Sequence, residues 1–196
     1  MKIERTSIAL LATLVLTVAA DAQNGSGIPE PNAEARDEMA RLAPLVGDWD
    51  ATLFTPSDDG GWQAMGIDRV TIHYLLNDLA LREAIPEHSS MGWRLESTIQ
   101  YDYLLDTYRL VAIDDTWGRM DVYEGDWVTD NTLELTNLES GVGFPVSDEH
   151  TLYFRLVTTI DDVNHNVFQV DMTLDGGQSW QPYQRMVRNR AADSGG

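Results

Sequence analysis

Residues 97–102 (STIQYD), 107–114 (TYRLVAID) and 119–127 (RMDVYEGDW) are three consecutive runs rich in β-branched and aromatic residues. Short breaks containing Asp and Gly separate the runs, which is typical of strands joined by tight turns. Side chains alternate along a strand, so Tyr108 and Asp114 share one face of the middle run and Arg109 lies on the other. Both faces also carry apolar residues. The three runs therefore predict an antiparallel meander.

Runs of the same kind occur on both sides of this meander. They are linked by short turns, and no helical period of crossover length separates them, which excludes a parallel α/β sheet. Together with the meander they give about ten strands, and we predict an all-β protein, a single antiparallel lipocalin-like β-barrel with a short N-terminal helix. The strand of the first meander run is expected to extend over residues 93–102, and the additional strands are expected after Trp49 and at residues 67–76, 79–85, 132–137, 150–160, 166–174 and 180–188.

The expected helix lies before the first strand. Asn32 is a suitable N-cap, and Pro44 ends the helical pattern that runs from Ala33 to Ala43. We expect this helix to close one end of the barrel. Its apolar stripe comprises Ala35, Met39, Leu42 and Val46.

The N-terminal residues have the pattern of a secretory signal. Lys2 and Arg5 precede an apolar run at residues 8–20, and Ala22 completes a small-x-small cleavage pattern. The run is shorter than the roughly 20 apolar residues that span a bilayer, so a cleaved signal over residues 1–22 is favoured over a membrane anchor. The expected product is periplasmic or secreted.

The remaining domain boundaries follow from composition. Residues 23–31 form a Gly- and Pro-rich flexible tether, residues 32–190 form the barrel domain, and residues 191–196 form a disordered tail. The prior for a chain of 196 residues is one domain of ordinary size.

The charge of the chain restricts its partners. The formal net charge is −19, and the only lysine lies in the expected signal. Such a charge repels phosphate backbones and anionic membrane surfaces, so we predict no nucleic-acid partner and no stable membrane insertion after signal cleavage. The chain has no cysteine, which excludes disulfides and Cys-based metal sites.

Gly47-Asp48-Trp49 leads into the first strand and resembles the opening of lipocalin-like (calycin) barrels, in which the Trp plugs the barrel floor. The resemblance implies that Trp49 packs under an Arg of the last strand, which we take to be Arg185. Over about residues 38–190 the chain also resembles the bacterial domain-of-unknown-function family 1579, a lipocalin-like group that implies no particular reaction. The residues that carry this second resemblance are Tyr101, Asp102, Tyr108, Asp114, Glu124, Gly125, Tyr183 and Arg185.

Cofactor and metal sites find no support in the sequence. A related group of small barrels binds haem through an opening Gly-x-Trp-x-Gly-x-Gly, but residues 50–53 lack the later glycines. The four histidines lack the His-x-x-x-His spacing of a local zinc site. We therefore predict no cofactor and no metal.

His73 lies in the middle of an expected strand and shares a face with Arg69 and Thr71. We expect this face to line the barrel cavity, because neighbouring polar side chains need shared partners. An interior His73 is then a candidate acid/base, and the alternative is a hydrogen-bonded histidine of the sheet.

Glu83 and Asp114 are acidic residues in apolar strands. Burial would raise the pKa of each carboxyl group and suit it to general acid/base work, while pairing with a strand arginine is the alternative. The catalytic candidates are His73, Glu83 and Asp114, and the expected ligand contacts are His73, Arg69, Tyr101 and Asp114.

The sequence favours binding of a small, apolar or amphipathic ligand in the barrel, because small barrels have room for one such molecule. Two alternatives stay open: a cofactor-independent isomerase, hydratase or hydrolase that uses the acid/base candidates, and a protein-interaction module. The oligomeric state and the ligand's identity are not encoded in any pattern we recognise.

Overall fold

The computed structural model describes residues 30–85, 89, 90, 92 and 94–192. The expected signal at residues 1–22, most of the expected tether and the last four residues of the chain lie outside the described residues. Helix α1 (Ala33–Ala40) and the 3₁₀ helix η2 (Ala43–Leu45) precede the strands. No helix of the described part of the chain is long and apolar enough to cross a membrane.

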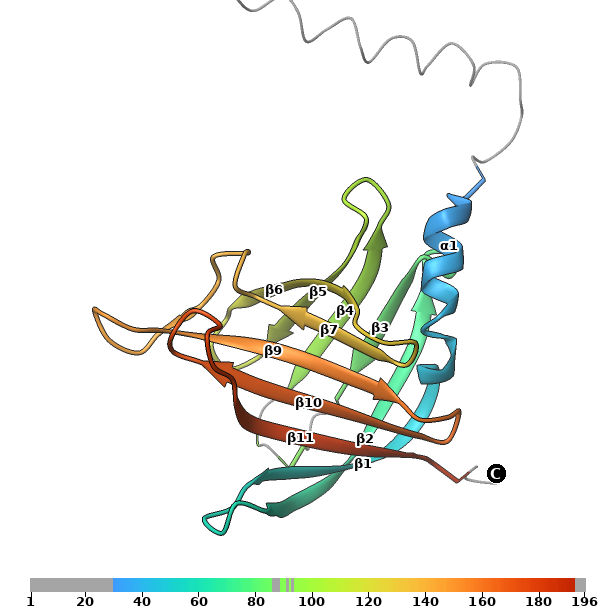
Figure 1. Ribbon diagram of the computed structural model, residues 1–196. Helices are drawn as coiled ribbons and strands as arrows, with labels where there is room; N and C mark the ends of the chain where they lie inside the picture. Colours follow the sequence, from blue (N-terminus) through green and yellow to red (C-terminus); the bar gives the residue numbers. More distant parts are fainter. Residues whose placement is uncertain (1–29, 86–88, 91, 93, 193–196) are drawn as a thin grey trace, which may run out of the picture. The chain divides into compact units, whose positions relative to one another are not determined.

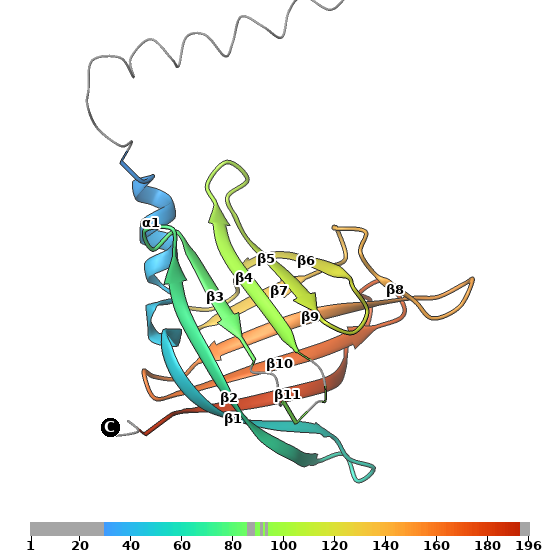
Figure 2. The ribbon, with the colours of Figure 1, turned by 180° about the vertical axis from the view of Figure 1, so that it is seen from behind.

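All strands belong to one antiparallel arrangement, which Figures 1 and 2 show from opposite sides. Neighbours along the chain pair in sequence, and the sheet closes because β1 pairs with β11 and β9 pairs with β10. The prediction of a single antiparallel barrel is confirmed: ten strands close, and β8 is an extra strand beside β9. The strands are β1 (Gly47–Pro56), β2 (Trp62–Leu75), β3 (Ala80–Ala84), β4 (Leu95–Asp102), β5 (Thr107–Asp114), β6 (Met120–Trp127), β7 (Thr132–Thr136), β8 (Phe144–Pro145), β9 (Thr151–Ile160), β10 (His165–Thr173) and β11 (Gln181–Arg190).

Helix α1 starts as the sequence predicts and ends three residues earlier. The side chain of Asn32 accepts a hydrogen bond from the backbone N–H of Ala35 at 2.9 Å. The hydroxyl groups of Tyr74 and Tyr108 donate to the helix carbonyls of Met39 and Glu38, each at 2.8 Å. The helix is thereby fixed to the barrel, and the expectation that it closes one end is confirmed.

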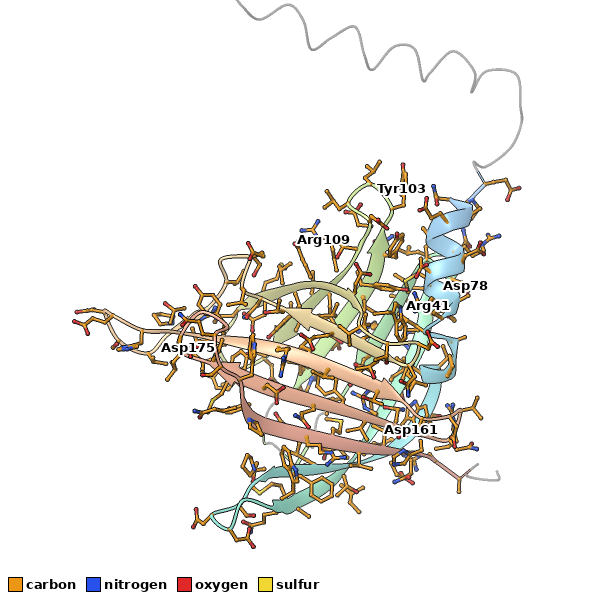
Figure 3. The ribbon with its side chains drawn as sticks, viewed as in Figure 1. Arg41, Asp78, Tyr103, Arg109, Asp161 and Asp175 are labelled. Carbon is orange, nitrogen blue, oxygen red and sulfur yellow. The ribbon has the colours of Figure 1, made fainter. Side chains whose placement is uncertain are left out.

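The turns between strands lie at two opposite ends of the barrel, and helix α1 is at one of them. Figure 3 shows Asp78, Tyr103 and Asp161 at the end that carries α1, and Asp175 at the opposite end. Asp175 closes the turn between β10 and β11, where its carboxylate accepts hydrogen bonds from Thr173 and Ser179 that hold its pKa at about 2. We call the end without the helix the mouth of the barrel.

Trp49 is fully buried at the helix end, as expected for a floor residue, but its arginine is not the predicted one. The guanidinium of Arg190 lies 3.9 Å from the centre of the Trp49 ring, and Trp49 pairs with Arg190 across β1 and β11. Arg185 pairs instead with Phe54 and lies 5.8 Å from the ring centre of Trp62. The predicted contact between Trp49 and Arg185 is therefore wrong. Strands β1 and β11 are antiparallel, so the start of β1 meets the end of β11.

Arg190 ties the floor together through backbone carbonyl groups. Its guanidinium donates to the carbonyls of Val46 at 2.6 Å, Pro44 at 3.0 Å and Val163 at 2.9 Å. Gly47 makes room for it, because a Cβ there would lie 2.1 Å from an Arg190 nitrogen, and its φ of 134° disfavours other residues. The glycine of the opening Gly-x-Trp therefore makes space for the arginine that covers the tryptophan.

We predict that Arg190→Lys destabilises the barrel by about 2–3 kcal/mol, because lysine cannot form this fork of hydrogen bonds or stack on Trp49. Arg185→Lys is the matched control on the same strand, and its cost should stay under about 1 kcal/mol. Urea unfolding followed by tryptophan fluorescence measures both. Equal costs at the two positions would contradict the assignment of Arg190 to the floor.

Candidate functional site

The barrel encloses a cavity of about 370 Å³. Its walls are the inner faces of the strands, and Leu42 and Leu45 close it at the helix end. Most of the lining is aliphatic or aromatic, which suits an apolar molecule or the apolar part of one. The polar and charged side chains of the lining are Glu83, Ser97, Asp114, Asp121, Tyr123, Thr158, Tyr183, Gln184 and Arg188.

An ion pair crosses the interior between Glu83 on β3 and Arg188 on β11. Arg188 is 1% exposed, its Nε faces the Met186 sulfur at 3.4 Å, and its guanidinium lies 5.1 Å from the Phe168 ring centre. A buried guanidinium requires a partner of opposite charge, and Glu83 supplies it. The alternative for Glu83 that the sequence left open, pairing with an arginine, is the one present in the structure.

The strand register places Glu83 in a row that crosses four neighbouring strands. Glu83 pairs with Ser97, Ser97 with Ala112, and Ala112 with Asp121. Residues that pair directly across a sheet point to the same face. The inner wall at this level therefore carries a carboxylate, a hydroxyl, a methyl group and a second carboxylate.

Asp121 is the least satisfied of these groups. Its Oδ1 atom is buried without a hydrogen-bond partner, and the Arg119 guanidinium lies 3.5 Å from it without forming a hydrogen bond. Arg119 itself donates to the carbonyls of Val142 and Gly143, each at 3.0 Å. Burial raises the pKa of the Asp121 carboxyl group, Arg119 lowers it and the nearby Asp114 raises it further. Asp121 thus has an acceptor atom free.

Tyr123 follows Asp121 on the inner face of β6. It is only 5% exposed, and within the described residues its hydroxyl has no hydrogen-bond partner. Burial, and then the charge of Asp121, raise the pKa of this phenol, so it is protonated at neutral pH. Tyr123 therefore adds a neutral polar group next to the Asp121 carboxylate.

Asp114 lines the cavity nearer the mouth. One of its oxygens accepts hydrogen bonds from the backbone N–H groups of Thr116 at 2.7 Å and Trp117 at 2.5 Å, which shape the turn after β5. Asp114 sits diagonally across the strand pair from Asp121, since Asp121 faces Ala112. The structure thus brings Glu83 and Asp114 into one cavity.

His73 and Arg69 lie on the outer face of β2, and the prediction that His73 lines the cavity is wrong. Arg69 pairs with Asp50 at 3.4 Å, and His73 faces Arg82 across the strands, while Ile72 lines the cavity. The polar face of β2 finds partners outside the barrel and needs no interior ones. His73 is therefore separated from the two acidic candidates by the sheet.

Tyr101 faces inward but lies outside the cavity. Its ring packs edge-on against Tyr108 at 5.2 Å between centres, and its hydroxyl donates to Asp106 in the turn after β4. This position belongs to the packed end beneath α1. Tyr101 is not among the residues that line the cavity, so its expected contact with a ligand stays a prediction that the cavity does not support.

Sequence reasoning missed Asp121, Tyr123 and Arg188 as interior polar residues. Alternation within the third run places Asp121 and Tyr123 on one face, but only the pairing of Asp121 with Ala112 shows that this face is the inner one. Arg188 had no such signal, because it is 105 residues from Glu83 and their contact depends on closure of the barrel.

The family model described as Protein of unknown function (DUF1579) matches residues 34–190. The chain belongs to the DUF1579 family. The resemblance noted in the sequence is thereby confirmed, and its extent agrees with the barrel domain of the structure.

Among solved structures, the DUF1579 barrel is similar to the crystal structure of Rv2717c from M. tuberculosis. The TM-score is 0.51 at 17% sequence identity, and the match covers 79% of this chain and 97% of that chain. At this identity the likeness shows the fold alone. No curated protein matches the chain.

We predict that Arg188→Met destabilises the DUF1579 barrel by about 3–5 kcal/mol, because it leaves the Glu83 carboxylate inside without its cation. The double variant Glu83→Leu with Arg188→Met should be more stable than this single variant, since an apolar pair removes the unpaired charge. Urea unfolding of the wild type, Glu83→Leu, Arg188→Met and the double variant measures the coupling energy between the two side chains. Additive losses would show that the two charges do not depend on each other.

Proposed function

We propose that the DUF1579 barrel binds one small amphipathic molecule, with its apolar part in the cavity and its polar group against the polar wall of β5 and β6. The observation that supports this most is the cavity of about 370 Å³ with its largely apolar lining. A cavity of this kind buries most of a small molecule's surface and gains free energy in proportion to the apolar area covered.

Several contacts favour binding over catalysis. Glu83 is held by Arg188, and Asp114 uses one oxygen to hold the turn after β5. His73, the expected base of the enzyme alternative, lies on the outside of the sheet. General acid/base catalysis requires a proton-transfer group within hydrogen-bond reach of the substrate, and no histidine is among the described residues that line the cavity.

Nile red, a neutral apolar dye, tests the cavity directly. We predict that the protein binds it and that Ala112→Phe lowers the affinity at least about tenfold, because the new ring occupies the centre of the inner wall. Val111→Phe places the same ring on the outer face of the same strand and should change the affinity less than about twofold. Fluorescence titration measures both variants.

The two variants separate filling of the cavity from general damage. Circular dichroism and thermal unfolding establish that each variant retains the barrel. Equal dye affinities for Ala112→Phe and Val111→Phe would place binding outside the cavity and contradict the proposal.

We also propose that the protein is exported, to the periplasm or beyond it. The support is the sequence pattern of residues 1–22, with its basic start, apolar run and small-residue cleavage site. The mature chain should begin at Gln23. N-terminal sequencing of protein from the expressing bacterium decides this, and an intact Met1 would refute it.

A further inference from the structure

The charges that line the cavity are unequal. Among the described lining residues, three carboxylates, from Glu83, Asp114 and Asp121, face one guanidinium, from Arg188. That guanidinium is paired with Glu83. Arg119 beside the mouth is engaged as well, by two backbone carbonyls and by the Phe144 ring, whose centre lies 3.7 Å from the guanidinium. A ligand with an anionic head group would therefore lie next to carboxylates. No described lining residue offers it an unpaired positive charge.

The free groups of the wall can accept hydrogen bonds, and the Tyr123 hydroxyl can also donate one. Asp121 has a buried oxygen without a hydrogen-bond partner, and Tyr123, 5% exposed, has a hydroxyl without a partner in the described part of the chain. Asp114 lies on the adjacent strand, close enough to influence the Asp121 carboxyl group. We call Asp114, Asp121 and Tyr123 the acceptor wall.

We propose that the acceptor wall binds a positively charged amine, so that the ligand of this barrel is a cationic amphipath such as a protonated alkyl amine. This inference rests on the proposed function and specifies its ligand class. An ammonium group has three donors and no acceptor, which complements a carboxylate oxygen and a phenol oxygen. Its charge also offsets the desolvation of two neighbouring carboxylates.

The same wall discriminates against other head groups for separate physical reasons. A carboxylate head group would add a further negative charge to a region of low dielectric that already holds two. An alcohol would satisfy one acceptor but bring no positive charge to Asp121, whose neighbouring guanidinium, that of Arg119, lies 3.5 Å away without a hydrogen bond. The order of affinity at equal chain length is therefore amine, then alcohol, then carboxylate.

Decylamine, decanol and decanoate share one alkyl chain and test this order by isothermal titration calorimetry below their critical micelle concentrations. We expect decylamine to bind at least about tenfold more tightly than either of the others, which is the gain from one hydrogen bond to a charged group. Displacement of Nile red by each probe establishes that binding occurs in the cavity.

Two variants of the acceptor wall assign the preference to named groups. Asp121→Asn should lower decylamine affinity at least about tenfold and leave decanol affinity within about threefold. Tyr123→Phe should also weaken decylamine more than decanol. Glu124→Gln is the control, since it removes the same charge from the outer face of β6, where Glu124 pairs with Arg109 at 2.9 Å.

The outcomes separate this inference from the proposed function. Binding of Nile red with equal affinity for the three probes, or tighter binding of decanoate, would overturn the amine assignment and leave the cavity as a binding site. An equal loss in Asp121→Asn and Glu124→Gln would assign the preference to overall charge and overturn the role of the wall. Failure of Nile red and all three probes to bind would overturn both proposals.

Discussion

Closure of the sheet, in which the first strand β1 pairs with the last strand β11, is the constraint from which the interior follows. In an open sheet each strand faces solvent or a covering layer, whereas a closed barrel commits every second residue to one shared interior. A slip of one residue in any pairing would exchange the two faces of that strand. The stacking of Arg190 on Trp49 favours one alignment of β1 with β11. The alignment of each following strand pair then sets which residues, Ala112 among them, face the interior.

The polar groups of the interior fall into two kinds according to their partners. Arg190 and Arg188 are held by backbone carbonyls and by Glu83, so their charges are satisfied by the fold itself. Asp68, also buried, accepts hydrogen bonds from the backbone and side chain of Ser90, at 2.6 and 3.0 Å. Asp121 has a buried oxygen without a hydrogen bond, with Arg119 3.5 Å away, and no described residue forms a hydrogen bond with the Tyr123 hydroxyl; both residues lie on one wall. Since an unsatisfied buried polar group costs free energy, its presence in a cavity is a reason to look for a ligand.

The sequence was sufficient for features that depend on local periodicity. The meander of β4 to β6 and the Asn32 cap follow from alternation and capping rules applied to neighbouring residues. It was insufficient where both faces of a strand carry mixed residues. In β2 the polar face was expected inside because polar groups need partners, yet Asp50 and solvent supply partners outside.

Features that depend on register between distant strands were also beyond local patterns. Choosing Arg185 rather than Arg190 as the partner of Trp49 required the alignment of the first and last strands, which no short motif encodes. The pair of Glu83 with Arg188 has the same dependence on barrel closure. Rules applied to neighbouring residues thus predict the strands and the helix. Contacts between the first and last parts of the chain can be read only from the closed barrel.

The overall charge of the chain and the charge of the cavity have the same sign, and they act at different stages of binding. A net charge of −19 attracts cations over a distance limited by ionic screening, and this long-range field chiefly affects the rate of association. The carboxylates inside act at contact, where water is excluded and hydrogen-bond geometry distinguishes one head group from another. Added salt should therefore slow the capture of a cationic molecule more than it weakens the bound state. A neutral molecule of the same shape would lack this dependence, so the salt dependence of the association rate separates the field of the whole protein from the chemistry of its cavity.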